Sequence, residues 1–226
     1  MPSSAGGELF LRVPHRIDWS VNMTSNKDSK AAVEIPNTRD HLLEVGLRLI
    51  RARGYSSTGV AEILDEAGVP KGSFYHHFAS KEVFANEVLK VYVKGEHARV
   101  ERILREGKGA PLRRLRRYFD EVISVYGQTA AVSGCILGSM SLEMADRSDL
   151  MQAFLHHTFS NWQASIGAVL QEAMDRGDLA KSNEPEELAS FLLNSYEGAL
   201  LRSKADRSNK PLETFLHFTF NVLLKG

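Results

Sequence analysis

The most reactive side chain in this sequence of 226 residues is the thiol of its single cysteine, Cys135. The pattern around Cys135 predicts the start of a helix, and a thiol in the first turn of a helix lies at the positive end of the helix dipole. That position increases the thiolate fraction that attacks electrophiles and oxidants. The alternative is that Cys135 is a small buried hydrophobic residue beside Gly134 and Ile136, as most free cysteines are.

The other residue types that carry chemistry do not form a catalytic or metal-binding pattern. The adjacent pairs His76-His77 and His156-His157 point about 100° apart on a helix, which does not suit a metal ion. No nucleophile elbow or glycine-rich phosphate loop is present. We therefore expect no cofactor, no metal and no enzyme activity; a small thiol enzyme that uses Cys135 with a histidine is a distant alternative.

Composition excludes several classes of protein. One cysteine cannot form an intramolecular disulfide, which argues against a secreted disulfide-rich scaffold and favours the cytoplasm. No stretch has the length of a membrane span, and no signal peptide is recognisable. The 28 basic and 28 acidic residues give a formal net charge of zero, so binding to DNA would have to come from a local motif. The run Arg113–Arg117 is interpreted as the solvated side of a helix whose buried side carries Leu112, Leu115 and Phe119.

These side chains must be positioned by helices, because no segment alternates apolar and polar residues over the length of a strand. Residues 1–37 lack periodicity and are expected to form a flexible arm, with Met23 as an alternative true start. Thr38 is expected to cap the first helix. About nine helices follow from the apolar spacing and the Gly and Pro breaks. They are expected at 38–53, 60–67, 71–78, 80–105, 111–126, from 134, 148–176, 184–205 and 211–224.

The segment from Thr58 to Glu82 has the mechanics of a helix-turn-helix. Val60, Ile63 and Leu64 form the buried stripe of a short helix, and Gly68 permits the tight turn after it. Phe74 and Phe78, four residues apart, anchor the inner face of the second helix. The outer face and the first turn of that helix would then meet DNA bases and phosphates. This set comprises Lys71, Gly72, Ser73, Tyr75 and His76.

Residues 39–85 resemble the DNA-binding domain of the TetR family of bacterial repressors. The resemblance is carried by the run Gly68–Glu82, which reads Gly-Val-Pro-Lys-Gly-Ser-Phe-Tyr-His-His-Phe-Ala-Ser-Lys-Glu. It implies an all-α fold, with a three-helix DNA-binding domain at 38–85 and an effector-binding and dimerisation domain at 86–226. It also implies phosphate contacts from Thr58 and Lys81, and contacts to bases or the DNA backbone from Lys71, Gly72, Ser73, Tyr75 and His76.

The second half resembles the NemR- and AcuR-like subgroup, whose members respond to electrophiles or to acrylate. The matching stretches are Ser133–Gly138, Ser141–Met144 and Glu197–Lys204. The resemblance implies that Cys135 is a reactive thiol with Lys204 as its neighbour. Induction by a small ligand without covalent chemistry, with Cys135 as packing, is the alternative.

The resemblance further implies a homodimer that binds a palindromic operator in double-stranded DNA and is released by a small-molecule effector. The last two helices, at about 184–205 and 211–224, are apolar over broad faces, as expected of helices that pack on their own domain and on a partner. Four large side chains are expected to line the effector pocket or to belong to the core. They are Phe119, Met140, Trp162 and Tyr196.

Overall fold

The computed structural model describes residues 37–127, 134–181 and 184–225. The expected N-terminal arm at 1–37, apart from Asn37 itself, and the start at Met23 lie outside these residues. All nine α-helices in the described ranges match an expected segment, and these ranges contain no strand. The all-α expectation is confirmed.

Three short helices come first: α1 (Thr38–Arg53), α2 (Val60–Ala67) and α3 (Lys71–His77). The side chain of Asn37, and not that of the expected Thr38, caps α1 by accepting a hydrogen bond from the backbone N–H of Arg39 at 3.1 Å. The turn between α2 and α3 begins at Gly68, whose φ of 66° lies in the left-handed region. A residue with a Cβ would be strained there.

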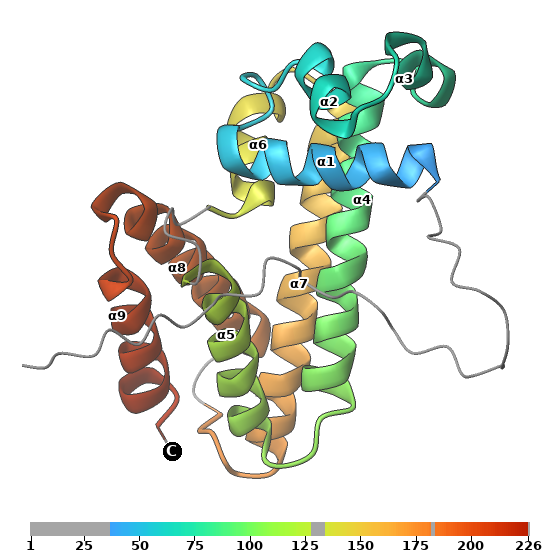
Figure 1. The fold of residues 1–226 in the computed structure, drawn as a ribbon. Helices are drawn as coiled ribbons and strands as arrows, with labels where there is room; N and C mark the ends of the chain where they lie inside the picture. The colour runs from blue at the N-terminus through green and yellow to red at the C-terminus, as the bar shows by residue number, and fades with distance from the viewer. Residues whose placement is uncertain (1–36, 128–133, 182–183, 226) are drawn as a thin grey trace, which may run out of the picture. The chain divides into compact units, whose positions relative to one another are not determined.

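Six further helices follow, and four of them have 17 residues or more (Figure 1). They are α4 (Lys81–Val100), α5 (Pro111–Gly127), α6 (Ile136–Met144), α7 (Asp149–Asp175), α8 (Pro185–Asp206) and α9 (Lys210–Phe218). Two π-helical turns, η1 (Glu101–Arg105) and η2 (Thr219–Leu223), continue α4 and α9. The sequence pattern had predicted plain α-helix through both turns.

The three short helices are packed onto the long ones through α4. Phe84 of α4 lies 5.1 Å from Phe74 and 4.9 Å from Phe78, measured between ring centroids. On the other side of Phe84, Gly46 of α1 leaves no room for a side chain, since a Cβ there would lie 2.3 Å from the ring. The expected domain boundary near residue 85 therefore lies inside α4, a continuous helix that spans both expected domains within the compact unit 35–226.

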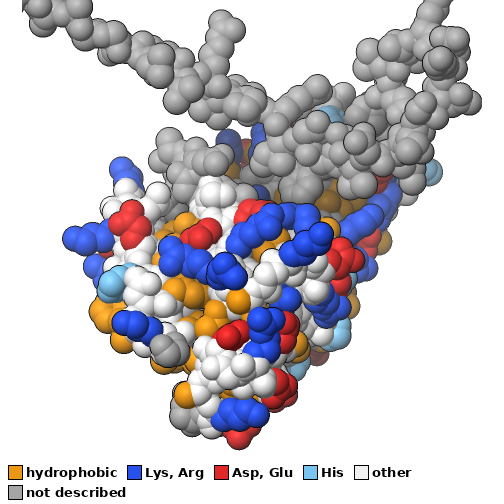
Figure 2. All heavy atoms as spheres, turned by 90° about the horizontal axis from the view of Figure 1, so that it is seen from below, with side chains coloured by type: hydrophobic (Ala, Val, Ile, Leu, Met, Phe, Trp, Pro, Cys, Tyr) orange, Lys and Arg blue, Asp and Glu red, His pale blue; other side chains and the backbone are white. Residues whose placement is uncertain are grey.

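The arginine-rich start of α5 lies at the end of the bundle seen in Figure 2, where basic side chains stand among acidic and hydrophobic ones. Leu115 and Phe119 are buried, as expected, and Arg113 and Arg117 are exposed. Arg114 departs from the expected solvated side, because it is largely buried against the carboxylate of Glu172 on α7. An open hollow of about 310 Å³ lies beside these arginines.

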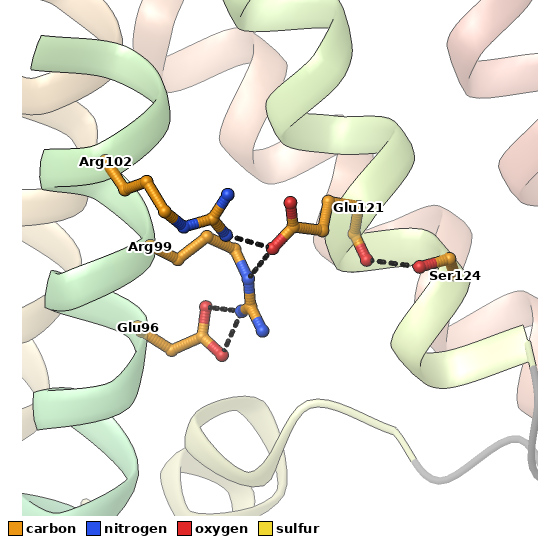
Figure 3. Close-up of polar contacts among 5 residues, drawn as sticks. All are labelled: Glu96, Arg99, Arg102, Glu121 and Ser124. Carbon is orange, nitrogen blue, oxygen red and sulfur yellow. Dashed lines mark hydrogen bonds and ion pairs between the residues drawn. The ribbon is translucent and has the colours of Figure 1, made fainter. Parts of the chain in front are cut away.

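An ion-pair network, which we call the α4–α5 lattice, joins α4, η1 and α5 (Figure 3). Arg99 stands at its centre with a side chain only 10% exposed. It binds Glu96 of its own helix, and its Nε donates to Oε1 of Glu121 at 3.2 Å. Arg102 of η1 binds the same carboxylate oxygen of Glu121. The lattice therefore fixes α5 to the lower end of α4.

Candidate DNA-binding surface and regulatory site

The first turn and outer face of α3 are open to solvent. Lys71, Gly72, Tyr75 and His76 are exposed, Tyr75 to 58%, and Ser73 is partly exposed. A Cβ placed on Gly72 would meet no atom within 4 Å. Buried Phe74 and Phe78 hold the opposite face, with their ring centroids 5.5 Å apart. The short helix is thus anchored on one side and presents a set of donors on the other.

Positive charge is scarce on this surface. Between Gly54 and Ser80, Lys71 is the only lysine or arginine. The first turn of α3 contains no acidic residue, so the ammonium group of Lys71 and the helix dipole act together on an approaching phosphate.

Two residues expected to contact phosphate are instead engaged within the protein. Thr58 is 0% exposed, and its hydroxyl donates to the carbonyl oxygen of Gly54 at 2.7 Å. The ammonium group of Lys81 donates to the carbonyl oxygen of Tyr55 at 2.7 Å and lies 4.2 Å from the centroid of the Tyr55 ring. In this conformation Thr58 and Lys81 stabilise the loop before α2, and the side chain of Thr58 does not reach the surface.

Glu143, in the last turn of α6, binds the same loop from the second half of the chain. Its two carboxylate oxygens accept hydrogen bonds from the backbone N–H groups of Tyr55 at 3.0 Å and Ser56 at 2.6 Å. Burial raises the pKa of Glu143, but the donors at Ser56 and Tyr55 and the charge of Lys81 outweigh burial and bring the pKa below its usual value. Glu143 therefore remains ionised near neutral pH.

The opposite end of α6 carries Cys135, which is buried and occupies the position before the first helical residue. Burial and the charge of Glu197 on α8 raise the pKa of the Cys135 thiol well above its ordinary value, although the backbone amides of Gly138 and Leu137 oppose the change. The expected lowering of this pKa is therefore wrong for this conformation. The sequence pattern identified the helix start and gave burial of Cys135 as the alternative, but it did not show the carboxylate of Glu197 beside the thiol.

Glu197 is the main polar partner of Cys135. The thiol donates a hydrogen bond to its carboxylate, and burial raises the pKa of Glu197 to about 7. Its Oε1 atom is buried and has no hydrogen-bond partner among the described residues. Leu193 and Leu200, four residues before and three after Glu197, are buried. An acidic residue within that apolar stripe was the signal from which Glu197 could have been found.

Lys204, the other expected neighbour of Cys135, is exposed and makes no hydrogen bond or ion pair with the described residues. Its side chain passes near Gly134, where an added Cβ would lie 3.6 Å from Cδ of Lys204. Lys204 is therefore adjacent to the segment that contains Cys135, while the carboxylate of Glu197 is the group that contacts the thiol.

Three of the four expected pocket residues form one buried aromatic cluster. The ring of Tyr196 lies 5.5 Å from that of Phe119 and 5.9 Å from that of Trp162, between centroids. Met140 is also fully buried, on α6. The indole nitrogen of Trp162 is buried without a hydrogen-bond partner in the described chain. The cluster is packed, and the hollow of about 440 Å³ between α8 and α9 is lined by other residues.

The described residues offer neither a metal site nor a membrane span. They contain no group of three or more His, Cys, Asp or Glu side chains arranged to hold a metal ion. Among them, no helix has both the length and the apolar character needed to cross a membrane.

Comparison with known families gives two matches to this chain. Residues 42–88 match the family model for bacterial regulatory proteins of the tetR family. Residues 111–219 match the model for a tetracyclin repressor-like C-terminal domain. The first match contains α2, α3 and the loop held by Glu143, and the second contains Cys135 and Glu197.

Similar proteins of known name are transcriptional regulators. The repressor DhaR of Mycobacterium sp. (strain GP1) is 36% identical over 82% of this chain and 92% of its own. The repressor NemR of Escherichia coli (strain K12) is 33% identical over 83% of this chain and 94% of its own. The crystal structure of reduced E. coli NemR aligns with a TM-score of 0.76 at 34% identity, over 82% of this chain and 96% of that one.

Proposed function

Because this chain belongs to the tetR family of bacterial regulatory proteins and is a transcriptional repressor of that family, we propose that it binds a palindromic operator through α3 and that an effector releases it. The observation that carries the DNA-binding part is the exposed first turn of α3, held by buried Phe74 and Phe78. Lys71, Gly72, Ser73, Tyr75 and His76 would contact bases and the DNA backbone. Lys81 and Thr58 would act by holding the loop before α2 in place.

The proposed binding unit is a homodimer formed through α8 and α9. Both helices bury one face in their own chain and leave large apolar side chains exposed on another, among them Phe191 at 58% and Leu201 at 62%. Phe218 at the end of α9 and Val222 in η2 are also exposed. A two-fold dimer would place two copies of α3 in successive major grooves, about 34–36 Å apart. We place its action in the cytoplasm, where it would meet the chromosome.

The operator is tested with DNA from upstream of the gene that encodes this protein. We expect the Kd for this DNA to rise with salt concentration. In Lys71→Ala the Kd should be at least tenfold higher, because one phosphate or base contact is lost in each half of the dimer. Lys90→Ala is the matched control, since Lys90 is an exposed lysine on α4 that pairs with Glu87. Absence of sequence-specific binding at any salt concentration would exclude the proposal.

We further propose that the effector acts next to Cys135, either as an electrophile or oxidant or as a non-covalent ligand. In the electrophilic case the sulfur would bond to the β-carbon of an activated alkene, while Glu197 takes the thiol proton and delivers it to the α-carbon. The raised pKa of Cys135 keeps the thiol protonated in this conformation, so such a reaction needs Glu197 as the proton acceptor. A non-covalent effector would need only the buried polar atoms nearby.

Cys135→Ser distinguishes the two cases in an operator-release assay with a quinone, an aldehyde and hypochlorite. A covalent mechanism predicts that the variant binds operator DNA but is no longer released. Full retention of the response to these compounds would favour the non-covalent alternative, with Cys135 as packing. A thiol enzyme receives no support, because the similar proteins are transcriptional regulators.

A further inference from the structure

Helix α6 contacts functional parts of the chain at both of its ends. At its first turn, Gly138 and Cys135 face Glu197 of α8, and a Cβ on Gly138 would lie 3.0 Å from Oε2 of Glu197. At its last turn, Glu143 binds the loop that precedes α2. Cys135 and Glu143 are eight positions apart in the sequence, which corresponds to only about 12 Å at the helical rise of about 1.5 Å per residue.

The contact made by Glu143 is well suited to transmit a movement. Both carboxylate oxygens are used, and their donors are backbone N–H groups, so the carboxylate holds the path of the chain itself. An ionised acceptor strengthens each hydrogen bond. The space is closed as well, because a Cβ on neighbouring Gly54, whose φ is 87°, would lie 2.6 Å from Oε1 of Glu143.

The loop held by Glu143 also determines how the helix-turn-helix begins. The hydroxyl of Thr58 donates to Gly54, and Lys81 at the start of α4 donates to Tyr55. The loop thereby joins the end of α1, the start of α2 and the start of α4. Movement of the Tyr55 and Ser56 backbone would therefore reach α2, which packs directly on α3.

From this arrangement we infer that Glu143 is a positioning residue that couples the start of α6, beside Cys135 and Glu197, to the helix-turn-helix. The inference rests on the proposed function and extends it by naming the residue through which an effector event reaches the DNA-binding helices. A displacement of the first turn of α6 away from α8 pulls the Glu143 carboxylate from Tyr55 and Ser56 and weakens operator binding.

The test is a double-mutant cycle that needs no effector. Gly138→Leu forces the first turn of α6 away from Glu197, and Gly138→Ala is the milder step should the leucine variant fail to fold. Each is combined with Glu143→Gln and with Glu143→Ala. Asp146→Asn is the matched control, since Asp146 is an exposed carboxylate three residues beyond Glu143 that has no ion pair with the described residues.

We expect Gly138→Leu to weaken operator binding about fivefold or more, which is the lower end of ordinary allosteric coupling. The effect of Gly138→Leu should fall below about twofold in the Glu143→Ala background and stay unchanged in the Asp146→Asn background. If Glu143 only stabilises the fold, the effects of the Gly138 and Glu143 substitutions on the free energy of operator binding would add. Additive effects, or no effect of either Gly138 substitution in a folded protein, would overturn the inference.

Hydrogen exchange at the amides of Tyr55 and Ser56 gives a second measurement that does not involve DNA. Both amides should be protected in the unmodified chain and exchange faster in Glu143→Gln and in Gly138→Leu. Unchanged protection in Gly138→Leu would overturn the inference by itself. If the unmodified chain does not bind operator DNA, the proposed function fails, whereas the exchange measurement still tests the coupling.

Discussion

Glu197 brings a carboxyl group into a helix face that is otherwise apolar, where it meets the thiol of Cys135. Burial raises the pKa of both groups, and the charge of Glu197 raises the pKa of Cys135 further, whereas the hydrogen bond from the thiol partly opposes the rise at Glu197. The pair is therefore in its protonated, hydrogen-bonded form below neutral pH and becomes less stable as Glu197 ionises. This gives the regulatory half a sensitivity to pH that the sequence pattern did not indicate.

The pH dependence of stability should reveal Glu197 directly. Its native pKa of about 7 lies above the ordinary value of 4.5, so its contribution to stability is complete below about pH 4.5 and is lost as the pH rises through about 7. Glu197→Gln should reduce the change in the free energy of unfolding between low and high pH by up to about 3 kcal/mol. Urea unfolding at pH 4.5, 6 and 8 measures it. Glu187→Gln, an exposed position on the same helix, is the control, and identical pH profiles for both variants would refute the expectation.

Gly72 offers a test of the DNA-contacting surface that separates function from folding. Ala at this position meets no atom of the protein within 4 Å, so the unfolding free energy should stay the same or increase by about 0.5–1 kcal/mol. The added methyl group would stand where the operator approaches, and operator affinity should fall at least fivefold. Thermal unfolding and DNA titration are compared with Gly59→Ala, which also meets no atom but lies outside α3. If Gly72→Ala binds operator DNA with unchanged affinity, the DNA contacts a surface other than the first turn of α3.

At the level of single residues, sequence reasoning succeeded where a side chain serves one simple purpose. Phe74 and Phe78 are buried, and Tyr75 and His76 are exposed, as their spacing on α3 predicts. It missed Glu143 and Glu197, because each acts on atoms more than 50 positions away in the sequence. Helical periodicity reports which face a residue is on, and it carries no information about which distant segment packs there.

Among the elements, α4 connects two parts of the fold, because it packs on α1 at one end and is joined to α5 by an ion pair at the other. Gly46 and Phe84 make the upper contact, and the α4–α5 lattice makes the lower one. The helical spans could be predicted within a few residues from apolar spacing, Gly and Pro. The π-helical turns η1 and η2 could not, because residues 101–105 and 219–223 show no Gly or Pro break.

The α4–α5 lattice should contribute measurably to stability. Arg99→Ala leaves the carboxylates of Glu96 and Glu121 without their most buried partner, and the expected loss is about 2–4 kcal/mol in the free energy of unfolding. Arg105→Ala removes an exposed pair with Glu101 instead and should cost less than about 1 kcal/mol. Urea denaturation of both variants gives the comparison. Equal, small losses would show that the lattice does not stabilise the bundle.

At the scale of the whole molecule, the proposed dimer should depend on the apolar surface of α8 and α9. Phe191→Glu and Leu201→Glu each place a charge on that surface and should shift the protein from dimer to monomer in analytical ultracentrifugation. Operator affinity should fall at least tenfold in parallel, because a monomer offers a single α3. Leu142→Glu is the matched control, since Leu142 is 81% exposed on α6. A dimer that survives both Phe191→Glu and Leu201→Glu would place the interface on another surface.

The equal numbers of acidic and basic residues, together with Lys71 as the single lysine or arginine between Gly54 and Ser80, determine how the protein searches a chromosome. Attraction to arbitrary DNA comes almost entirely from positive charge that neutralises phosphates. A repressor with so little of it spends a small part of its time on the millions of wrong sites that compete for it. We therefore expect weak binding to arbitrary DNA, so that fewer copies per cell are needed to keep one operator occupied.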